Sequence, residues 1–208
     1  HKDTTNGIPF RRIAYLSTDR LRLKHESVCV FKKMGKGCFF FNIPSKSVTF
    51  TQADFKEVLD FLLYKPTFRH ILIGGGSEDP AIESQNITYL AQEIRKRNKE
   101  IPIYLMSLPP SDLATLYLYK KAGINEVAFN IEIWDRSIAG KLMPGKAEIP
   151  LEKYIEVLKA STNIWGKTGN VRTALIVGLN QESELIKAIQ YLCSLGIQPM
   201  LSVFRPMP

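Results

Sequence analysis

The sequence predicts an α/β fold, a partial (βα)6 TIM-like barrel with parallel strands, from three observations. Short apolar runs alternate with longer amphipathic stretches along most of the 208 residues, which is the pattern of βαβ units. The apolar runs lack a clean alternation of polar residues, as expected when both faces of a parallel sheet are covered. A complete eightfold barrel takes about 250 residues. Six βα repeats in a chain of this length therefore predict an open or partial barrel.

The elements follow one another in a regular order. The first strand is expected near Cys29, and Ser111 is expected to cap the helix that it precedes. The further strands are predicted at residues 69–76, 101–108, 126–133, 171–179 and 197–208, and the helices at 51–64, 82–98, 111–122, 150–165 and 182–195.

Composition bounds the class of protein. Hydrophobic residues make up 45% of the chain, enough for a sizeable core, and we expect a single core domain over residues 1–208. Residues 1–24 are expected to be an N-terminal extension, and a C-terminal region is expected to be absent from this sequence. No apolar run approaches the roughly 18 residues of a membrane span, and the first residues carry no signal-peptide core. Three cysteines, an odd number, argue against a disulfide scaffold and favour a reducing cytoplasm.

The net charge of +8 permits a nucleic acid, an anionic small molecule or an acidic partner. The densest basic run, at residues 93–100, is interleaved with acids and contains no aromatic residue on which a base could stack. It is typical of the solvated end of a helix. An RNA substrate is therefore permitted by the charge but is not favoured.

Several common sites are missing from the sequence. We find no P-loop, no GxGxxG between a strand and a helix, no HExxH and no GxSxG. This removes the common nucleotide-binding, zinc-protease and esterase interpretations.

Polar residues gather where the predicted strands end, which is where ligands bind in parallel α/β folds. Asn130 and Glu132 lie two residues apart on one strand and therefore share a face, where either a structural ion pair or a ligand contact would satisfy them. Cys193 lies on an apolar helix face and is expected to belong to the core. The other strand-end residues are Cys29 and Cys38; Gly74, Gly75, Gly76, Ser77 and Glu78; Gly178, Asn180 and Gln181; and Arg205. The glycines alone would also fit simple tight turns.

Taken together, these strand ends resemble those of the radical S-adenosylmethionine (SAM) superfamily, and residues 123–208 are similar to its biotin-synthase-like branch. "GGGSE" resembles the glycine-rich motif after strand two, and "FNIEI" resembles the strand-four motif with an Asn and an acidic residue two apart. "ALIVGLNQ" resembles the strand-five GxIxGxxE motif, with Ile176 and Gly178 kept but Ala174 and Gln181 in place of its Gly and Glu. "FRPMP" and "MPGK" also resemble segments of this branch.

The resemblance implies cofactors and partners. It implies a [4Fe–4S] cluster held by cysteines of the loop after the first strand, here Cys29 and Cys38, with SAM as the bound small molecule and ferredoxin or flavodoxin as the electron donor. It places Gly74, Gly75, Gly76 and Glu78 at the methionine part of SAM and Asn130 and Glu132 at its ribose. It also places Ile176, Gly178 and Arg205 near the rest of SAM, and Arg136 or Lys146 at its carboxylate. No catalytic residue or substrate follows from it.

The cysteine loop departs from the family pattern. The common motif is CxxxCxxC, whereas here eight residues separate Cys29 from Cys38, and Phe41 stands where the third cysteine is expected. Phenylalanine cannot ligate iron. Three hypotheses follow: a radical SAM enzyme core, a SAM-binding protein of this fold without a cluster, or an unrelated partial α/β barrel that acts on a phosphorylated small molecule.

Overall fold

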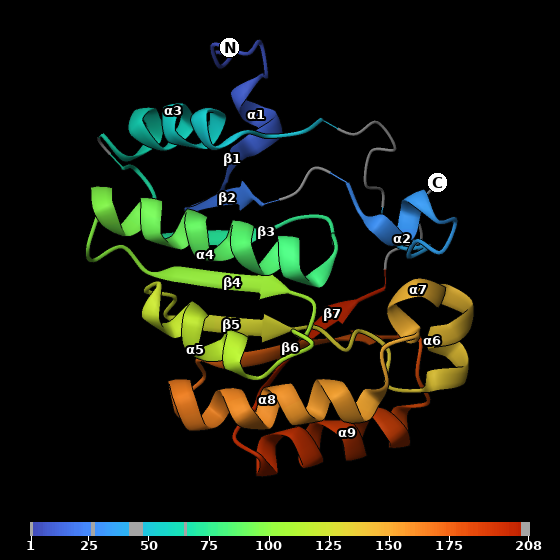
Figure 1. Cartoon of the computed structure of the whole chain (residues 1–208). Helices are drawn as coiled ribbons and strands as arrows, with labels where there is room; N and C mark the ends of the chain where they lie inside the picture. The colour runs from blue at the N-terminus through green and yellow to red at the C-terminus, as the bar shows by residue number, and fades with distance from the viewer. Residues whose placement is uncertain (1, 26–27, 42–47, 65, 205–208) are drawn as a thin grey trace.

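The computed structural model describes residues 2–25, 28–41, 48–64 and 66–204 (Figure 1). These residues contain one seven-stranded sheet in the order β1-β2-β3-β4-β5-β6-β7, parallel throughout except for the antiparallel pair β1–β2. The strands are β1 (Ala14–Ser17), β2 (Arg20–Lys24), β3 (His70–Gly74), β4 (Ile103–Ser107), β5 (Glu126–Phe129), β6 (Val171–Val177) and β7 (Gln198–Val203). The first and last strands do not pair, so the sheet stays open and the predicted partial barrel is confirmed.

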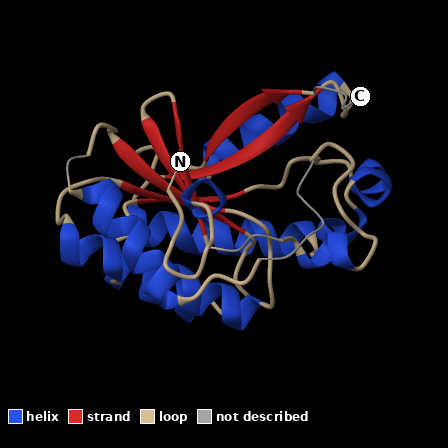
Figure 2. Ribbon diagram, turned by 90° about the horizontal axis from the view of Figure 1, so that it is seen from above, coloured by secondary structure: helices blue, strands red, loops and turns tan. Residues whose placement is uncertain are grey.

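The described residues form nine helices. They are α1 (Phe10–Ile13), α2 (Val30–Lys33), α3 (Gln52–Leu63), α4 (Pro80–Arg97), α5 (Ala114–Lys121), α6 (Arg136–Leu142), α7 (Pro144–Ala147), α8 (Leu151–Trp165) and α9 (Glu182–Ser194). Helix α1 precedes the first strand, and the other eight lie between strands. The long helices cover one face of the curved sheet (Figure 2). Within the part of the chain that the structure describes, no helix is long and apolar enough to cross a membrane.

The two faces of the sheet have different contents. Alternate strand residues such as Leu21, Ile73 and Phe129 join the large core under the helices. The residues between them point to the concave face, where Leu72 and Tyr104 form a smaller cluster with Ala128, Met106 and Met200. The concave face is therefore only partly filled by the protein's own side chains.

Four details differ from the sequence-based expectation. An additional strand, β1, and the first parallel strand, β2, both lie within the segment expected to be an N-terminal extension. The strand expected over 126–133 ends at Phe129, because beyond it the Thr173 and Asn130 side chains accept the backbone N–H groups of Ile131 and Ala174 in place of ladder carbonyls. Ser111 does not cap α5; the Asp112 side chain accepts the Ala114 N–H instead. Cys193 is exposed on α9, since its neighbour Leu192 takes the buried position.

Candidate functional site

The carboxyl ends of the parallel strands meet at one edge of the sheet, where α2, α6 and α7 also gather (Figure 1). A cavity of about 440 Å³ lies there, within the range of small-molecule sites. Its lining comes from five separate segments of the chain, at residues 25–41, 75–83, 106–108, 130–132 and 146. The lining residues with chemistry to offer are His25, Cys29, Cys38, Ser77, Glu83, Asn130, Glu132 and Lys146, together with the backbone of Gly75 and Gly76.

The cysteine loop is fixed against the glycine motif after β3. The Val30 N–H donates to the Ser77 carbonyl at 2.7 Å. A Cβ added to Gly76 would lie 2.1 Å from the Val28 carbonyl oxygen and 2.7 Å from the Cys29 nitrogen. Only glycine allows this approach, so the second motif requires its glycine because the first one packs directly on it.

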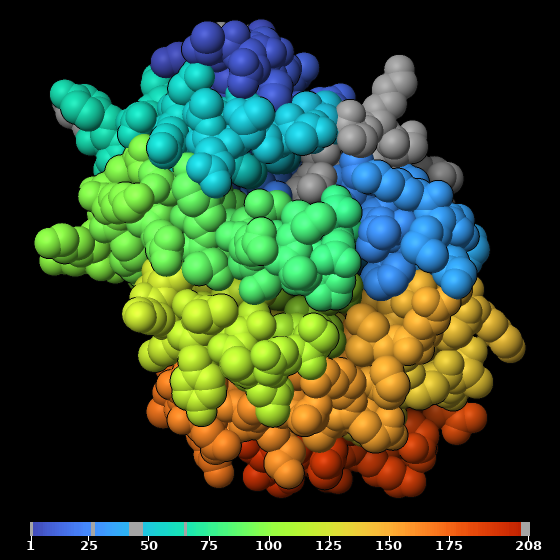
Figure 3. Space-filling model, viewed as in Figure 1, coloured from blue at the N-terminus to red at the C-terminus, as the bar shows by residue number. Residues whose placement is uncertain are grey.

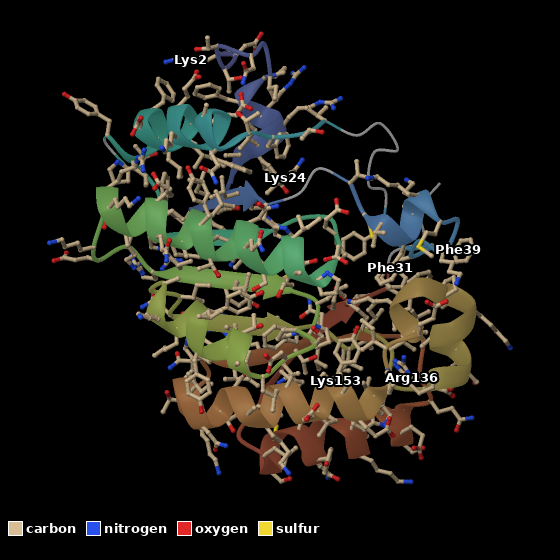
Figure 4. The ribbon with its side chains drawn as sticks, in the orientation of Figure 1. Lys2, Lys24, Phe31, Phe39, Arg136 and Lys153 are labelled. Carbon is tan, nitrogen blue, oxygen red and sulfur yellow. The ribbon has the colours of Figure 1, made fainter. Side chains whose placement is uncertain are left out.

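The other side of the loop is fixed against the "MPGK" segment. The Gly145 N–H donates to the Lys36 carbonyl at 3.0 Å, and Lys36 forms an ion pair with Glu148. A Cβ on Gly145 would come within 2.5 Å of the Phe31 ring, and the Phe39 N–H also bonds to the backbone of α6. Figure 4 shows Phe31 and Phe39 beside the sulfur atoms at this edge.

The eight residues between the cysteines fold back on themselves. Val30 to Lys33 form the short helix α2, and Gly35 turns the chain with a φ of 72°. Cys29 and Cys38 thereby line the same cavity and interact electrostatically. The wider spacing is thus compatible with two neighbouring thiols.

The two thiols differ in their surroundings. Cys29 is buried. Burial raises the pKa of Cys38 to about 11, although the Lys146 ammonium lowers it, and Glu132 and Cys29 raise it further. Phe41 also lines the cavity and is 57% exposed. Among the described residues, no group of three His, Cys, Asp or Glu side chains is arranged to hold a metal ion, so this part of the chain contributes two thiols.

Asn130 and Glu132 are both buried and both line the cavity. The Asn130 side-chain oxygen accepts the Ala174 N–H at 3.0 Å, which ties the end of β5 to β6. Glu132 holds its left-handed φ of 65° through backbone bonds to Ala174 and Ile176. A strained non-glycine backbone of this kind is typical of functional sites.

Lys146 brings a positive charge into the cavity. Its ammonium lies 3.1 Å from the Glu132 carboxylate, and both side chains are largely buried. Burial lowers the pKa of Lys146, but Glu132 and the neighbouring Tyr154 raise it more, so the net direction is upward. Lys146 therefore stays charged. The sequence left a structural ion pair and a ligand contact as alternatives for Glu132, and in the structure Glu132 both forms an ion pair and faces the cavity.

Other predicted site residues lie outside the lining of the cavity. The Arg136 guanidinium donates to the carbonyls of Ala147 and Ile149 and supports α7 (Figure 4). Glu78 lies at a second cavity of about 610 Å³ beside the first. Gly74, Ile176 and Gly178 contribute backbone near the strand ends but no lining atoms, and Arg205 lies outside the described residues.

Two buried residues of the cavity, His25 and Glu83, were not predicted from the sequence as site residues. His25 is 2% exposed, and its Nε2 lies 3.9 Å from the Glu83 carboxylate. The other Glu83 oxygen accepts the Glu78 N–H at 3.1 Å and so supports the glycine motif. Burial lowers the pKa of His25 to about 4, so the imidazole is neutral at physiological pH. In the sequence, Glu83 is an acidic residue in the first turn of a predicted helix, a common position for a carboxylate that does not indicate a site.

Comparison with known proteins agrees with this arrangement. Two crystal structures of HydG, a maturase of the [FeFe]-hydrogenase, superpose on 90% of the chain, with TM-scores of 0.67 and 0.66 and sequence identities of 14% and 16%. The second comes from Carboxydothermus hydrogenoformans. The chain shares the fold of these two proteins. The partial barrel predicted from the sequence is confirmed by this likeness.

A curated relative matches about half of the chain. The bacteriochlorophyllide c C-7(1)-hydroxylase of Chlorobaculum limnaeum is 27% identical over 110 residues, which are 52% of this chain. No protein-family model matches the chain. The domain spans 27% of the length of the hydroxylase and 42% and 44% of the two HydG chains.

The lining meets in part the needs of the two cofactors that the sequence resemblance implies. For SAM, Asn130, Glu132 and Lys146 supply polar groups of both charges beside the backbone of Gly75 and Gly76. For a cluster, Cys29 and Cys38 supply two thiols, and Phe41 lies where the third cysteine is expected.

Proposed function

We propose that this domain binds SAM in the cavity under the cysteine loop and is the core of a radical SAM enzyme. One observation carries the proposal: a single cavity gathers the thiols of Cys29 and Cys38, the backbone of Gly75 and Gly76, and the polar end of β5. These features come from segments far apart in the sequence. An unrelated barrel has no reason to bring them together.

The residues have distinct proposed roles toward SAM. Lys146 is placed to pair with its carboxylate, and the backbone of the glycine motif to accept bonds from its amino group. Glu132 is placed to accept bonds from the two ribose hydroxyls, as a carboxylate can do with both oxygens. The buried walls exclude water from the reacting atoms.

Cys29 and Cys38 would hold the iron–sulfur cluster, which when bound supplies one electron for the reductive cleavage of SAM. That cleavage would allow hydrogen to be removed from a C–H bond of the substrate, and the hydroxylase name of the curated relative supports chemistry at such a bond. A ferredoxin or flavodoxin would supply the electron.

A second candidate function is SAM binding without a cluster. Phe41 favours it, because this side chain lines the cavity at the expected third cysteine. Under this alternative the domain binds SAM as a regulatory or binding module.

One experiment separates the two candidates. The protein is reconstituted anaerobically with iron and sulfide, bound iron is counted, and SAM binding is measured by calorimetry. About four irons per chain, lost in Cys29→Ala and Cys38→Ala, with 5′-deoxyadenosine formed on reduction, support the enzyme. SAM binding without iron supports the second candidate, and absence of SAM binding overturns both. Phe41→Cys is expected to increase the iron content.

A further inference from the structure

The strand β2 carries a row of three cations. Leu21 and Leu23 point into the core under the helices, so the alternate residues Arg20, Arg22 and Lys24 lie on the concave face. With about 3.3 Å per residue, the row is about 13 Å long. It runs from the start of the strand to the edge where the cavity lies.

The neighbours of this row do not neutralise it. Arg22 lies between Tyr15 of β1 and Leu72 of β3, and Lys24 pairs in register with Gly74. Among the described strand residues of the concave face, the one carboxylate is Glu126, which is ion-paired with Arg172 at 2.9 Å. No described carboxylate forms an ion pair with any member of the row.

Arg22 is the member of the row that has a buried donor, its Nε, without a hydrogen-bond partner among the described residues. A buried donor without a partner costs free energy. A fixed guanidinium in this state is suited to an oxyanion that accepts two parallel hydrogen bonds.

The row acts on one titratable neighbour. Burial and the Arg20 guanidinium lower the pKa of His70, against the opposing effect of nearby acids. Within the row, burial and the Arg12 guanidinium of α1 lower the pKa of Lys24. Arg20 therefore disfavours a further positive charge at His70.

The row also leads to the proposed SAM site. Lys24 ends β2, the next residue, His25, lines the cavity, and the strand beside it continues into the glycine motif. Tyr15, whose ring lies 5.5 Å from the Lys24 ammonium, and Leu72 add apolar surface along the row. A molecule bound here would extend toward the cavity.

We propose that Arg20, Arg22 and Lys24 bind a carboxylate or phosphate group of the substrate, whose apolar part lies over Tyr15 and Leu72. This proposal rests on the proposed function, because it assumes that the protein has a substrate. It identifies the class of that substrate as an amphipathic small-molecule anion. Arg22 is the central contact, and Lys24 directs the molecule to the cavity.

The test uses matched probes that differ in charge. Protein labelled with 15N-arginine is titrated with 3-phenylpropionate and with phenyl phosphate, and the Nε–H signals are followed by NMR. 3-Phenylpropanamide and phenol serve as neutral controls. We expect the Arg22 signal to shift with an anion, not with the neutral probes, and the affinity to fall as salt is raised. Which anion binds more tightly distinguishes a carboxylate from a phosphate.

Variants make the result specific. Arg22→Gln is expected to weaken anion binding about tenfold or more, Arg22→Lys to weaken it less, and Arg11→Gln, an equal charge change at an exposed position of α1, to leave it unchanged. Equal binding of neutral probes, an equal effect of Arg11→Gln, or selective binding of an acidic peptide would overturn the proposal. SAM binding is measured on the same samples. If Arg22→Gln binds SAM but not the anion, both assignments stand. If the unaltered protein binds the anion but not SAM, the proposed function alone is contradicted.

Discussion

Gly76 is the residue at which the glycine motif and the cysteine loop touch. Gly76→Ala would force a Cβ to within 2.1 Å of the Val28 carbonyl, and backbone cannot give way as a flexible side chain does. We expect this variant to lose SAM binding measured by calorimetry and to melt at a lower temperature.

Gly140 provides the matched control. It lies within α6, and a Cβ there would meet nothing within 4 Å. Gly140→Ala is expected to keep SAM binding and to stabilise the protein by about 0.5–1 kcal/mol. Unchanged SAM binding by Gly76→Ala would contradict the contact between the two motifs.

The pair Lys146–Glu132 is the principal buried ion pair of the cavity. Lys146→Met leaves the Glu132 carboxylate buried without its partner, which costs about 3–5 kcal/mol. The double variant Lys146→Met/Glu132→Leu is expected to recover much of this stability but not SAM binding. Urea unfolding and calorimetry measure the two quantities separately. Full recovery of SAM binding by the double variant would rule out a contact between this pair and SAM.

At the scale of the element, α3 begins with a complete capping box. The Thr51 hydroxyl accepts the Asp54 N–H, and the Asp54 carboxylate accepts the Thr51 N–H at 2.8 Å. Thr51→Ala is expected to lower the free energy of unfolding by about 1 kcal/mol, as measured by urea denaturation. Thr51→Ser retains the hydroxyl and is expected to lose much less.

Helices and strands were predictable where the spacing of apolar residues agrees with the positions of residues that begin or end such elements. The helices over α3, α4, α8 and α9 were expected to within a few residues, because their apolar residues recur at helical spacing. The strand β1 was not expected, since its exposed Tyr15 and Leu16 give it no buried alternation. The early end of β5 comes from the Asn130 and Thr173 side chains, which replace ladder carbonyls as hydrogen-bond acceptors, and no residue pattern predicts this.

The site was predictable to a different extent. The order of the motifs along the chain brought Cys29, Cys38, Asn130 and Glu132 to one cavity, as parallel strands require. His25 was missed because a single histidine carries no spacing, and its burial under α4 is a tertiary effect. The cation row on β2 was also missed, since alternation there is visible only once β2 is known to be a strand.

At the scale of the whole molecule, the buried His25 couples stability to pH. Burial lowers its pKa from 6.5 to about 4, so between these values the unfolded chain binds a proton that the folded chain does not. Stability is therefore expected to fall by about 3 kcal/mol as the pH drops through this window. Carboxylates whose pKa is lowered in the folded state, such as Glu93, add to the loss from the acid end of this window downward.

Urea unfolding at several pH values between 7 and 4 measures this effect. His25→Leu removes the titrating group and is expected to flatten the profile in this window, whatever its effect at pH 7. A profile of the same steepness in His25→Leu would contradict the assignment of the effect to His25.

Contacts between segments that are far apart in the sequence are also visible at the surface of the molecule. In the space-filling view, the cysteine loop lies against the segment that contains α6 and α7 (Figure 3). Arg97 of α4, which also pairs with Glu93 of the same helix, forms an ion pair with Asp60 of α3. This ion pair joins two helices of the outer layer.

The folded-back cysteine loop has a consequence for how such domains vary. The segment from Val30 to Gly35 folds back through α2 and its turn. At its start the Val30 N–H is bonded to the Ser77 carbonyl, and just after it the Lys36 carbonyl is bonded to the Gly145 N–H. Residues could be added or removed at the tip without moving either thiol, at a loop-closure cost that grows only slowly with length. The distance between the two cysteines in sequence is therefore free to drift, whereas the two anchoring contacts are not.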